Sequence, residues 1–238
     1  MRTLKVLGFL LTYPSAQQIE VLPECREILR SEKWVPDAAL QKLNRLMEWM
    51  EGQDILDLQE EYVALFDLTP SLSLHLFEHV HGDSRDRGSA LVNLTNIYKE
   101  AGLVITTDEM PDYLPLFLEY LSILPPEEAR EHLDGAINVI AAIGERLKTR
   151  ESHYAGVFEA LSEAAHRKPD PKAIEEALKK NSGKAHSFEE LDEEWKEQFA
   201  FENTPQTTQG SGCPSAREMI ERMNRPIDPP DAKKGNLK

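Results

Sequence analysis

Cysteine is scarce in this chain of 238 residues, which contains only Cys25 and Cys213. The two lie far apart in the sequence, and neither belongs to a CxxC pair. A disulfide framework and a metal site built from thiolates are therefore not expected. Sparse, unpaired cysteines are typical of a reducing compartment, so the composition favours a cytoplasmic protein.

Long hydrophobic runs are also missing, because no apolar stretch approaches the roughly 20 residues that a membrane-spanning helix needs. Residues 6–11 form an apolar run that resembles the hydrophobic part of a signal peptide. That run is short, and no convincing small-x-small cleavage site follows it. We therefore expect the first residues to form a packed helix and predict no membrane insertion.

Positive charge is in deficit. Lysine and arginine number 27 against 42 aspartates and glutamates, which gives a formal net charge of −15. Non-specific binding to nucleic acid or to anionic membranes requires a basic surface, so the composition argues against both. A cationic partner would be attracted instead.

Strand patterns are weak, whereas apolar residues recur at helical spacing in several segments, for example at Leu40, Leu43, Met47 and Met50. Proline and glycine interrupt these segments and delimit roughly eight to ten helices. Residues 114–124 are apolar on nearly every side, which is typical of a helix at the centre of a bundle. We predict an all-α fold, a single multi-helix bundle with a disordered C-terminal tail.

Composition divides the chain into three parts. Residues 1–167 carry the apolar periodicity and are predicted to form the helical core. Residues 168–200 begin with the sequence KPDP and continue as a charged helical extension. Residues 201–238 first lack large apolar side chains and end rich in proline and lysine, so we predict a mostly disordered tail in which residues 215–223 form a short helix.

Two polar strings interrupt the apolar pattern of the core. The first, FEHVHGDSRDRG, occupies residues 77–88, and the second, EMPDYLPLFLEYL, occupies residues 109–121. Side chains that donate, accept and carry charge cost free energy when they are buried without partners. We therefore expect these residues to lie on a surface or in a cleft.

One reading of the first string is a metal site. His75, Glu78 and His79 fit the H-x-x-E-H pattern of inverted zinc metalloproteases, in which two histidines on one helix face bind zinc. This reading makes the protein a zinc-dependent hydrolase. A second alternative is a structural helical adaptor, in which both strings form internal helix caps and ion pairs.

Local chemistry gives each acidic residue of the second string a structural role as well. Asp112 is placed to cap the helix that starts at Tyr113. Glu119 lies among apolar neighbours, so its carboxylate requires a cation, which Arg85, Arg87 or a bound peptide would provide.

The first string also contains a histidine pair. His79 and His81 lie among acidic residues in the sequence, and we expect those acids to favour the charged imidazolium form.

The two strings closely resemble the NarJ family, the assembly chaperones of respiratory nitrate reductase. The resemblance lies in LFEHVHGDSRDRG at residues 76–88 and in residues 109–121, with EEYVALFD at residues 60–67 similar to the preceding helix of that family. It extends over residues 4–165 and leaves the tail unmatched.

This resemblance implies a helical bundle of the wider TorD/DmsD chaperone class, with no catalysis and no cofactor of its own. It implies binding of the N-terminal segment of the apo catalytic subunit, which is held in the cytoplasm until molybdenum cofactor and an iron–sulfur cluster are inserted. Molybdenum cofactor biosynthesis proteins are further candidate partners. The E-x-x-D-H pattern of related chaperones matches here at Glu109 and Asp112 and departs at Tyr113.

The resemblance and the residue chemistry together suggest an apolar groove with an acidic rim, which suits an amphipathic basic peptide. The expected groove residues are Tyr113, Leu116, Phe117 and Tyr120. The expected rim residues are Glu78, Glu109, Asp112 and Glu119. From the first string, the further candidates for contact with the peptide are His79, His81, Arg85, Asp86 and Arg87.

Overall fold

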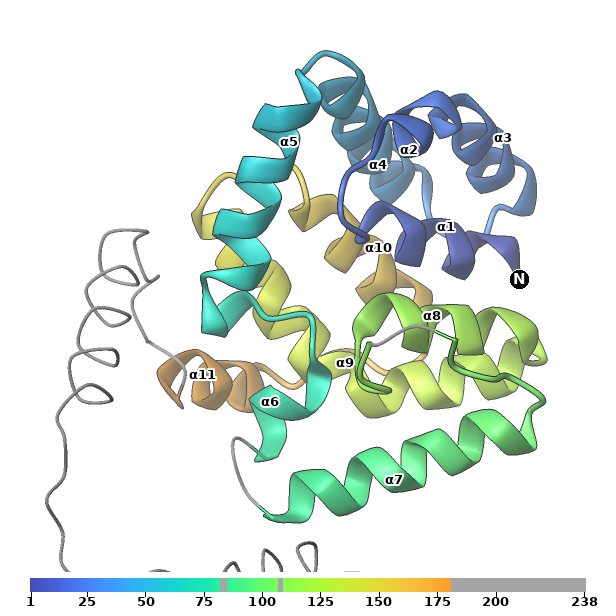
Figure 1. Cartoon of the computed structure of the whole chain (residues 1–238), viewed down its shortest axis with the longest axis vertical. Helices are drawn as coiled ribbons and strands as arrows, with labels where there is room; N and C mark the ends of the chain where they lie inside the picture. The colour runs from blue at the N-terminus through green and yellow to red at the C-terminus, as the bar shows by residue number, and fades with distance from the viewer. Residues whose placement is uncertain (82–84, 107–108, 181–238) are drawn as a thin grey trace, which may run out of the picture. The chain divides into compact units, whose positions relative to one another are not determined.

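The protein is helical throughout the part that the computed structural model describes, residues 1–81, 85–106 and 109–180 (Figure 1). No strand occurs in these residues, which confirms the predicted all-α class. The predicted tail and residues 181–200 of the predicted extension lie outside the described residues, so the three-part division stays a prediction. In chain order the helices are α1 (Arg2–Leu10), α2 (Ala16–Glu20), α3 (Leu22–Glu32), α4 (Asp37–Glu51), α5 (Ile55–Tyr62), the π-helix η1 (Val63–Asp67), the 3-10 helix η2 (Pro70–Leu72), α6 (Leu76–His81), α7 (Arg85–Glu100), α8 (Leu114–Ile123), α9 (Pro126–Thr149), α10 (Ala155–Ala164) and α11 (Pro171–Lys180).

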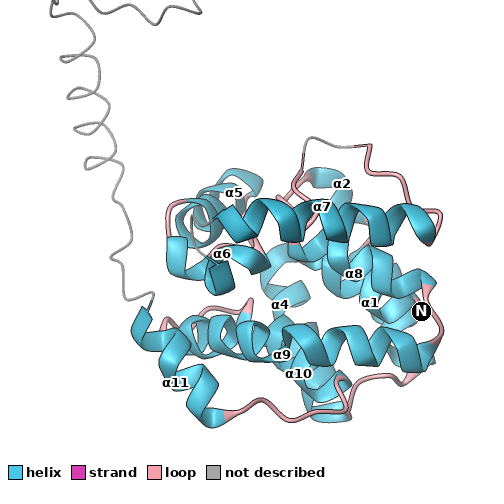
Figure 2. Ribbon diagram, turned by 90° about the horizontal axis from the view of Figure 1, so that it is seen from below, coloured by secondary structure: helices cyan, strands magenta, loops and turns pink. Residues whose placement is uncertain are grey.

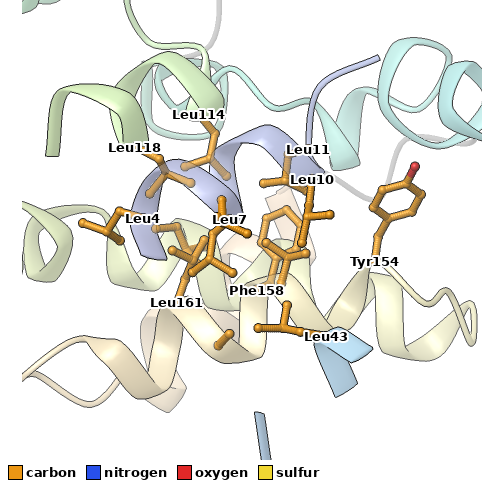
Figure 3. Close-up of a cluster of buried hydrophobic side chains, with 14 of the residues drawn as sticks. Leu4, Leu7, Leu10, Leu11, Leu43, Leu114, Leu118, Tyr154, Phe158 and Leu161 are labelled. Atoms are coloured by element: carbon orange, nitrogen blue, oxygen red, sulfur yellow. The ribbon is translucent and has the colours of Figure 1, made fainter. Parts of the chain in front are cut away.

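Helix α1 packs closely along α8 (Figure 3) and also contacts α3 and α10. Its residues Leu4, Leu7 and Leu10 are fully buried, which confirms the expectation of a packed first helix. The close approach depends on Gly8, because a Cβ atom there would lie only 3.0 Å from the backbone oxygen of Pro115. Helix α8 buries six of its ten residues, in agreement with its apolar sequence.

Helix α10 packs against both α9 and α4, and Figure 2 shows it beside α9. Helix α9 buries an apolar stripe and also contacts α6, α8 and α11. Among the described residues, no helix is both long enough and apolar enough to cross a membrane.

The two polar strings meet through a short antiparallel bridge between His75 and Tyr113. The backbone N–H of Leu76 donates to the carbonyl oxygen of Asp112 over 3.0 Å, and the N–H of Leu114 donates to that of Leu74 over 2.8 Å. Since these residues immediately precede or begin α6 and α8, the bridge fixes the starts of both helices side by side. Segments that are almost forty residues apart in sequence thereby form one site.

Candidate functional site

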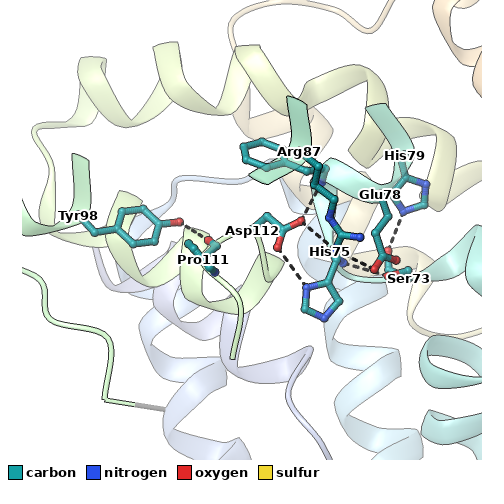
Figure 4. Close-up of polar contacts among 9 residues, drawn as sticks. Ser73, His75, Glu78, His79, Arg87, Tyr98, Pro111 and Asp112 are labelled. Atoms are coloured by element: carbon teal, nitrogen blue, oxygen red, sulfur yellow. Dashed lines mark hydrogen bonds and ion pairs between the residues drawn. The ribbon is translucent and has the colours of Figure 1, made fainter. Parts of the chain in front are cut away.

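Asp112 is the centre of the polar site, and its side chain is fully buried, at 0% exposure (Figure 4). Its Oδ2 accepts a hydrogen bond of 3.1 Å from the backbone N–H of Phe77, in the first turn of α6. Its Oδ1 lies 3.3 Å from Nδ1 of His75. The prediction that Asp112 caps α8 is wrong: the residue before α8 is Tyr113, and it makes no side-chain cap. The bridge turns the Asp112 carboxylate towards α6, so it caps the other helix.

Arg87 of α7 completes this network. Its Nη2 donates to Oε1 of Glu78 over 3.0 Å and lies 3.9 Å from Oδ2 of Asp112. Its Nε is buried and has no hydrogen-bond partner among the described residues. Burial raises the pKa of Asp112, but the bonds from His75 and Phe77 and the charge of Arg87 outweigh it, so that pKa lies below its ordinary value. Asp112 is therefore an ionised, buried carboxylate held between three elements.

The pKa values of His75 and His79 are shifted in opposite directions. The hydrogen bond to Asp112 raises the pKa of His75, and this effect outweighs the opposing effect of burial. Burial lowers the pKa of His79, and the nearby Arg146 charge lowers it further. The expectation that neighbouring acids favour the charged form of His79 is therefore wrong, because sequence proximity to acids counts for less than the loss of water around the ring.

The metal reading of the first string has no support in the geometry. His75 precedes α6 and points to Asp112, while Nε2 of His79 donates to the carbonyl oxygen of Ser73 over 2.8 Å. The two rings therefore bond to different partners. Within the described part of the chain, no group of three or more histidine, cysteine, aspartate or glutamate side chains is arranged to hold a metal.

A tyrosine pair that sequence reasoning missed adjoins this network. The hydroxyls of Tyr62 and Tyr113 lie 3.1 Å apart, and the Tyr62 hydroxyl donates to the carbonyl oxygen of Leu11 over 2.9 Å. These bonds anchor the start of α8 to α5 and to the end of α1. Tyr62 lies in EEYVALFD, the third string of the resemblance, which was the available signal for it.

Glu109 lies near a second acid that the sequence reading also missed, Asp67 at the end of η1. Burial raises the pKa of Asp67, and the charge of Glu109 raises it further. A nearby cation would stabilise the ionised form of this carboxyl group.

Glu119 points away from the polar network. It forms an ion pair of 3.0 Å with Lys5 of α1, and the two side chains are 46% and 64% exposed. The expectation that Glu119 is embedded among apolar groups and pairs with Arg85 or Arg87 is therefore wrong, because the side chain lies at the edge where α8 meets α1.

The apolar residues of α8 that were predicted to line a groove also lie in different surroundings. Tyr120 is buried against Tyr98, with ring centroids 4.8 Å apart, and Leu116 is half-buried. Phe117 instead contributes to an apolar cavity of about 200 Å³ between α6, α7, α8 and α9. We call this cavity the α6–α9 groove. It is lined by Leu76, Phe77, Val80, Leu94, Phe117, His132, Gly135, Ala136 and Val139.

Thus the structure brings Glu78, Arg87 and Asp112 together and places Phe117 in a groove beside them. It does not bring Leu116, Glu119 or Tyr120 to that groove. The side chains of His81, Arg85 and Asp86 lie outside the described residues.

Comparison with known proteins gives one consistent result. The family model described as nitrate reductase delta subunit matches residues 35–160 of this chain. The chain is 42% identical over 170 residues to a probable nitrate reductase molybdenum cofactor assembly chaperone, NarW of Escherichia coli K12, covering 69% of this chain and 68% of that protein.

Two NarJ proteins extend this similarity. The nitrate reductase molybdenum cofactor assembly chaperone NarJ of Escherichia coli K12 is 37% identical over 198 residues, which cover 83% of this chain and 84% of that protein. A probable NarJ of Bacillus subtilis is 28% identical over 160 residues, 67% of this chain and 85% of its own length. The chain therefore belongs to the nitrate reductase delta subunit family, the family of the NarJ and NarW assembly chaperones.

Proposed function

We propose that this protein is a cytoplasmic chaperone for the assembly of respiratory nitrate reductase. In this proposal it binds the N-terminal segment of the apo catalytic subunit and holds that subunit competent for insertion of molybdenum cofactor and an iron–sulfur cluster. It is not a component of the finished enzyme. The observation that carries the proposal is the similarity to NarJ and NarW over most of both chains.

The α6–α9 groove is the surface that best suits such a client. It is lined mainly by apolar residues from four helices, and an amphipathic helix binds to such a groove through the side chains of one face. Val80 lines the groove and is 59% exposed, so an apolar side chain is accessible there to a partner. The strongly negative chain adds attraction for a basic peptide and makes binding sensitive to salt.

The polar string has a different part in this proposal. Asp112 is fully buried and touches the backbone of Phe77, so it positions a groove wall and does not meet the client itself. Glu78 and Arg87 are partly exposed and remain candidates for direct contact. Glu109 supplies acidic charge near Asp67, where a basic client residue would relieve the repulsion between the two carboxylates.

Calorimetry with a synthetic peptide tests the proposal. We expect the first ~15–30 residues of a nitrate reductase catalytic subunit to bind with a dissociation constant in the micromolar range or tighter, on the order of −8 kcal/mol. A scrambled peptide of the same composition is the control. Absence of heat with the native peptide at high concentration would contradict the proposal.

A matched pair of variants locates the surface. Val80→Asp places a charge in the groove and is expected to weaken binding at least tenfold. Val92→Asp places the same charge on α7 at a similarly exposed valine, 63% against 59%, outside the groove lining, and is expected to leave affinity unchanged. Equal affinities for the two variants would remove the groove from the site. A pull-down from cells growing on nitrate would show whether molybdenum cofactor biosynthesis proteins accompany the client.

A further inference from the structure

Two polar side chains of α9 hold an irregular stretch of the chain by its backbone. Oδ1 of Asp134 accepts a hydrogen bond from the N–H of Arg167 over 2.9 Å, and Oδ1 of Asn138 accepts one from the N–H of Asp170, also over 2.9 Å. These two donors belong to residues 164–180, which start at the end of α10 and finish with α11 beside α9 (Figure 2). We call this segment the strap.

Two arginines of α9 bind the strap in the same manner. Arg130 donates to the carbonyl oxygen of Ala164 and Arg146 donates to that of Ala177, each over 2.6 Å. The four α9 residues are four or eight positions apart, so they follow one inclined row on the helix surface. Since each of the four bonds ends on a main-chain atom, they do not depend on the side chains of the strap.

The strap is only partly buried. None of residues 165–179 is fully buried, whereas α10, directly before them, buries seven of its ten residues. A segment with few buried apolar contacts opens at a lower free energy than the core of its domain. We therefore expect the strap to leave α9 while the bundle stays folded.

A cavity of about 410 Å³ lies between the strap and helices α4, α9 and α10. Pro169 and Ile174 of the strap line it without filling it, and small residues such as Ala141 and Gly144 line the opposite side. Its volume lies in the range of roughly 300–1,000 Å³ that is usual for ligand pockets. A larger apolar side chain than those of the strap has room there.

Charge favours a basic occupant of this surface. Three glutamates and two lysines line the cavity, and one of these acids, Glu163, forms no ion pair with another described residue. The strap itself carries two lysines and one arginine against one aspartate in HRKPDPK, residues 166–172, although the formal net charge of the chain is −15. A basic, extended peptide is thus the chemistry that this surface already holds.

We propose that the α9 surface under the strap is a second peptide-binding site, and that the strap exchanges there with a basic, extended segment of a partner protein. The partner segment bonds through its backbone to Asp134 and Asn138, places an apolar side chain in the cavity and brings a cation to Glu163. The site shares no lining residue with the α6–α9 groove, so it does not rest on the proposed function. Tethering favours the strap, because it keeps the effective concentration of the segment near the millimolar range.

Hydrogen exchange in the full-length chain tests whether the strap opens. After correction for intrinsic rates, we expect the amide hydrogens of Arg167 and Asp170 to exchange at least tenfold faster than those of Ile140 and Ile143, which are buried in α9. Exchange of all four at one common rate would show that the strap opens only with the whole bundle, and this result would overturn the proposal.

A fluorescent synthetic peptide of residues 164–180 then tests the site. In the variant Ile174→Asp, Leu178→Asp, new charge among the acids of the cavity and the lost apolar contact release the strap. We expect the peptide to bind this variant at least tenfold more tightly than the wild-type chain, as measured by fluorescence anisotropy. Adding Asp134→Ala and Asn138→Ala should return the affinity to the wild-type level, and circular dichroism checks that each variant is folded.

Two results of this titration would overturn the proposal. One is equal affinity for the wild-type chain and the released variant, and the other is undiminished binding after Asp134→Ala and Asn138→Ala. Light scattering covers a further outcome: a released variant that forms dimers which the peptide does not dissociate would assign the surface to a second copy and also overturn the proposal.

Modified peptides test recognition of the backbone itself. N-methylation at Arg167 and Asp170 removes the two N–H donors and should weaken binding to the released variant at least fivefold. The matched control is N-methylation at Lys168, whose N–H makes no hydrogen bond to the described part of α9, and it should leave affinity unchanged. An equal loss with both peptides would overturn the assignment of Asp134 and Asn138 as backbone-binding residues.

Discussion

Replacing Asp112 by asparagine removes the charge at the centre of the polar site while preserving its shape. The variant keeps one oxygen for the N–H of Phe77 and loses the charged partner of His75 and Arg87. Breaking a fully buried ion pair costs about 3–5 kcal/mol, and a hydrogen bond to a charged group contributes about 1.5–3 kcal/mol. The side chains of His75 and Arg87 are 26% and 20% exposed, so water partly compensates them. We therefore expect a loss of about 2–3 kcal/mol in the free energy of unfolding.

Urea unfolding followed by circular dichroism measures this loss, and a thermal scan should show a fall in Tm of roughly 4–12 °C. The control is Asp57→Asn on α5, where the side chain is exposed and the expected change is within about 0.5 kcal/mol. If Asp112→Asn were as stable as Asp57→Asn, the carboxylate would not hold the two strings together, and the account of the site would be refuted.

Five further substitutions test other parts of the structure. Glu119→Gln should change the unfolding free energy by less than about 1 kcal/mol, because its pair with Lys5 is exposed; a loss of several kcal/mol would show a buried role. His75→Gln should destabilise more at pH 5.5 than at pH 8.5, since the raised pKa of His75 stabilises the fold below an unfolded value of about 6.5 and this contribution disappears as pH rises through the folded pKa. His79→Gln should show the opposite trend, because its lowered pKa favours the fold above about 6.5 and opposes it as pH falls, and urea titrations at both pH values decide. Gly8→Ala should destabilise, because the new methyl group meets Pro115 at 3.0 Å, whereas Gly135→Ala should stabilise by about 0.5–1 kcal/mol in the same assay; a stabilised Gly8→Ala would contradict the close packing of α1 on α8.

The helical class and much of the core could be predicted from the sequence, because those features depend on periodicity along the chain. The run at residues 114–124 indicated a buried central helix, and α8 is buried. The apolar start of the chain indicated a packed helix, and α1 packs along α8. The spacing of apolar residues along the chain shows which helices are buried, even when the elements that pack against them are not known.

The polar site could be located from the sequence, although the roles within it could not. Asp112 was expected to cap the helix that follows it. It instead caps α6, which begins 36 residues earlier, because the bridge between His75 and Tyr113 brings the start of α6 beside it. Glu119 pairs with Lys5, which is 114 residues away. Such partners depend on the tertiary arrangement, which no local pattern encodes.

The position of Asp112 gives the second polar string a structural role. A fully buried Asp112 bonds to the backbone of Phe77 and fixes the start of α6, and the bridge fixes the start of α8. Those two helices supply Phe77 and Phe117 to the lining of one groove. The charged residues therefore set the spacing of the apolar ones, and a loss of client affinity in Asp112→Asn would arise from a displaced groove wall. In that case Asp112→Asn should weaken client binding without reducing its dependence on salt, because no charge that faces the peptide has been removed.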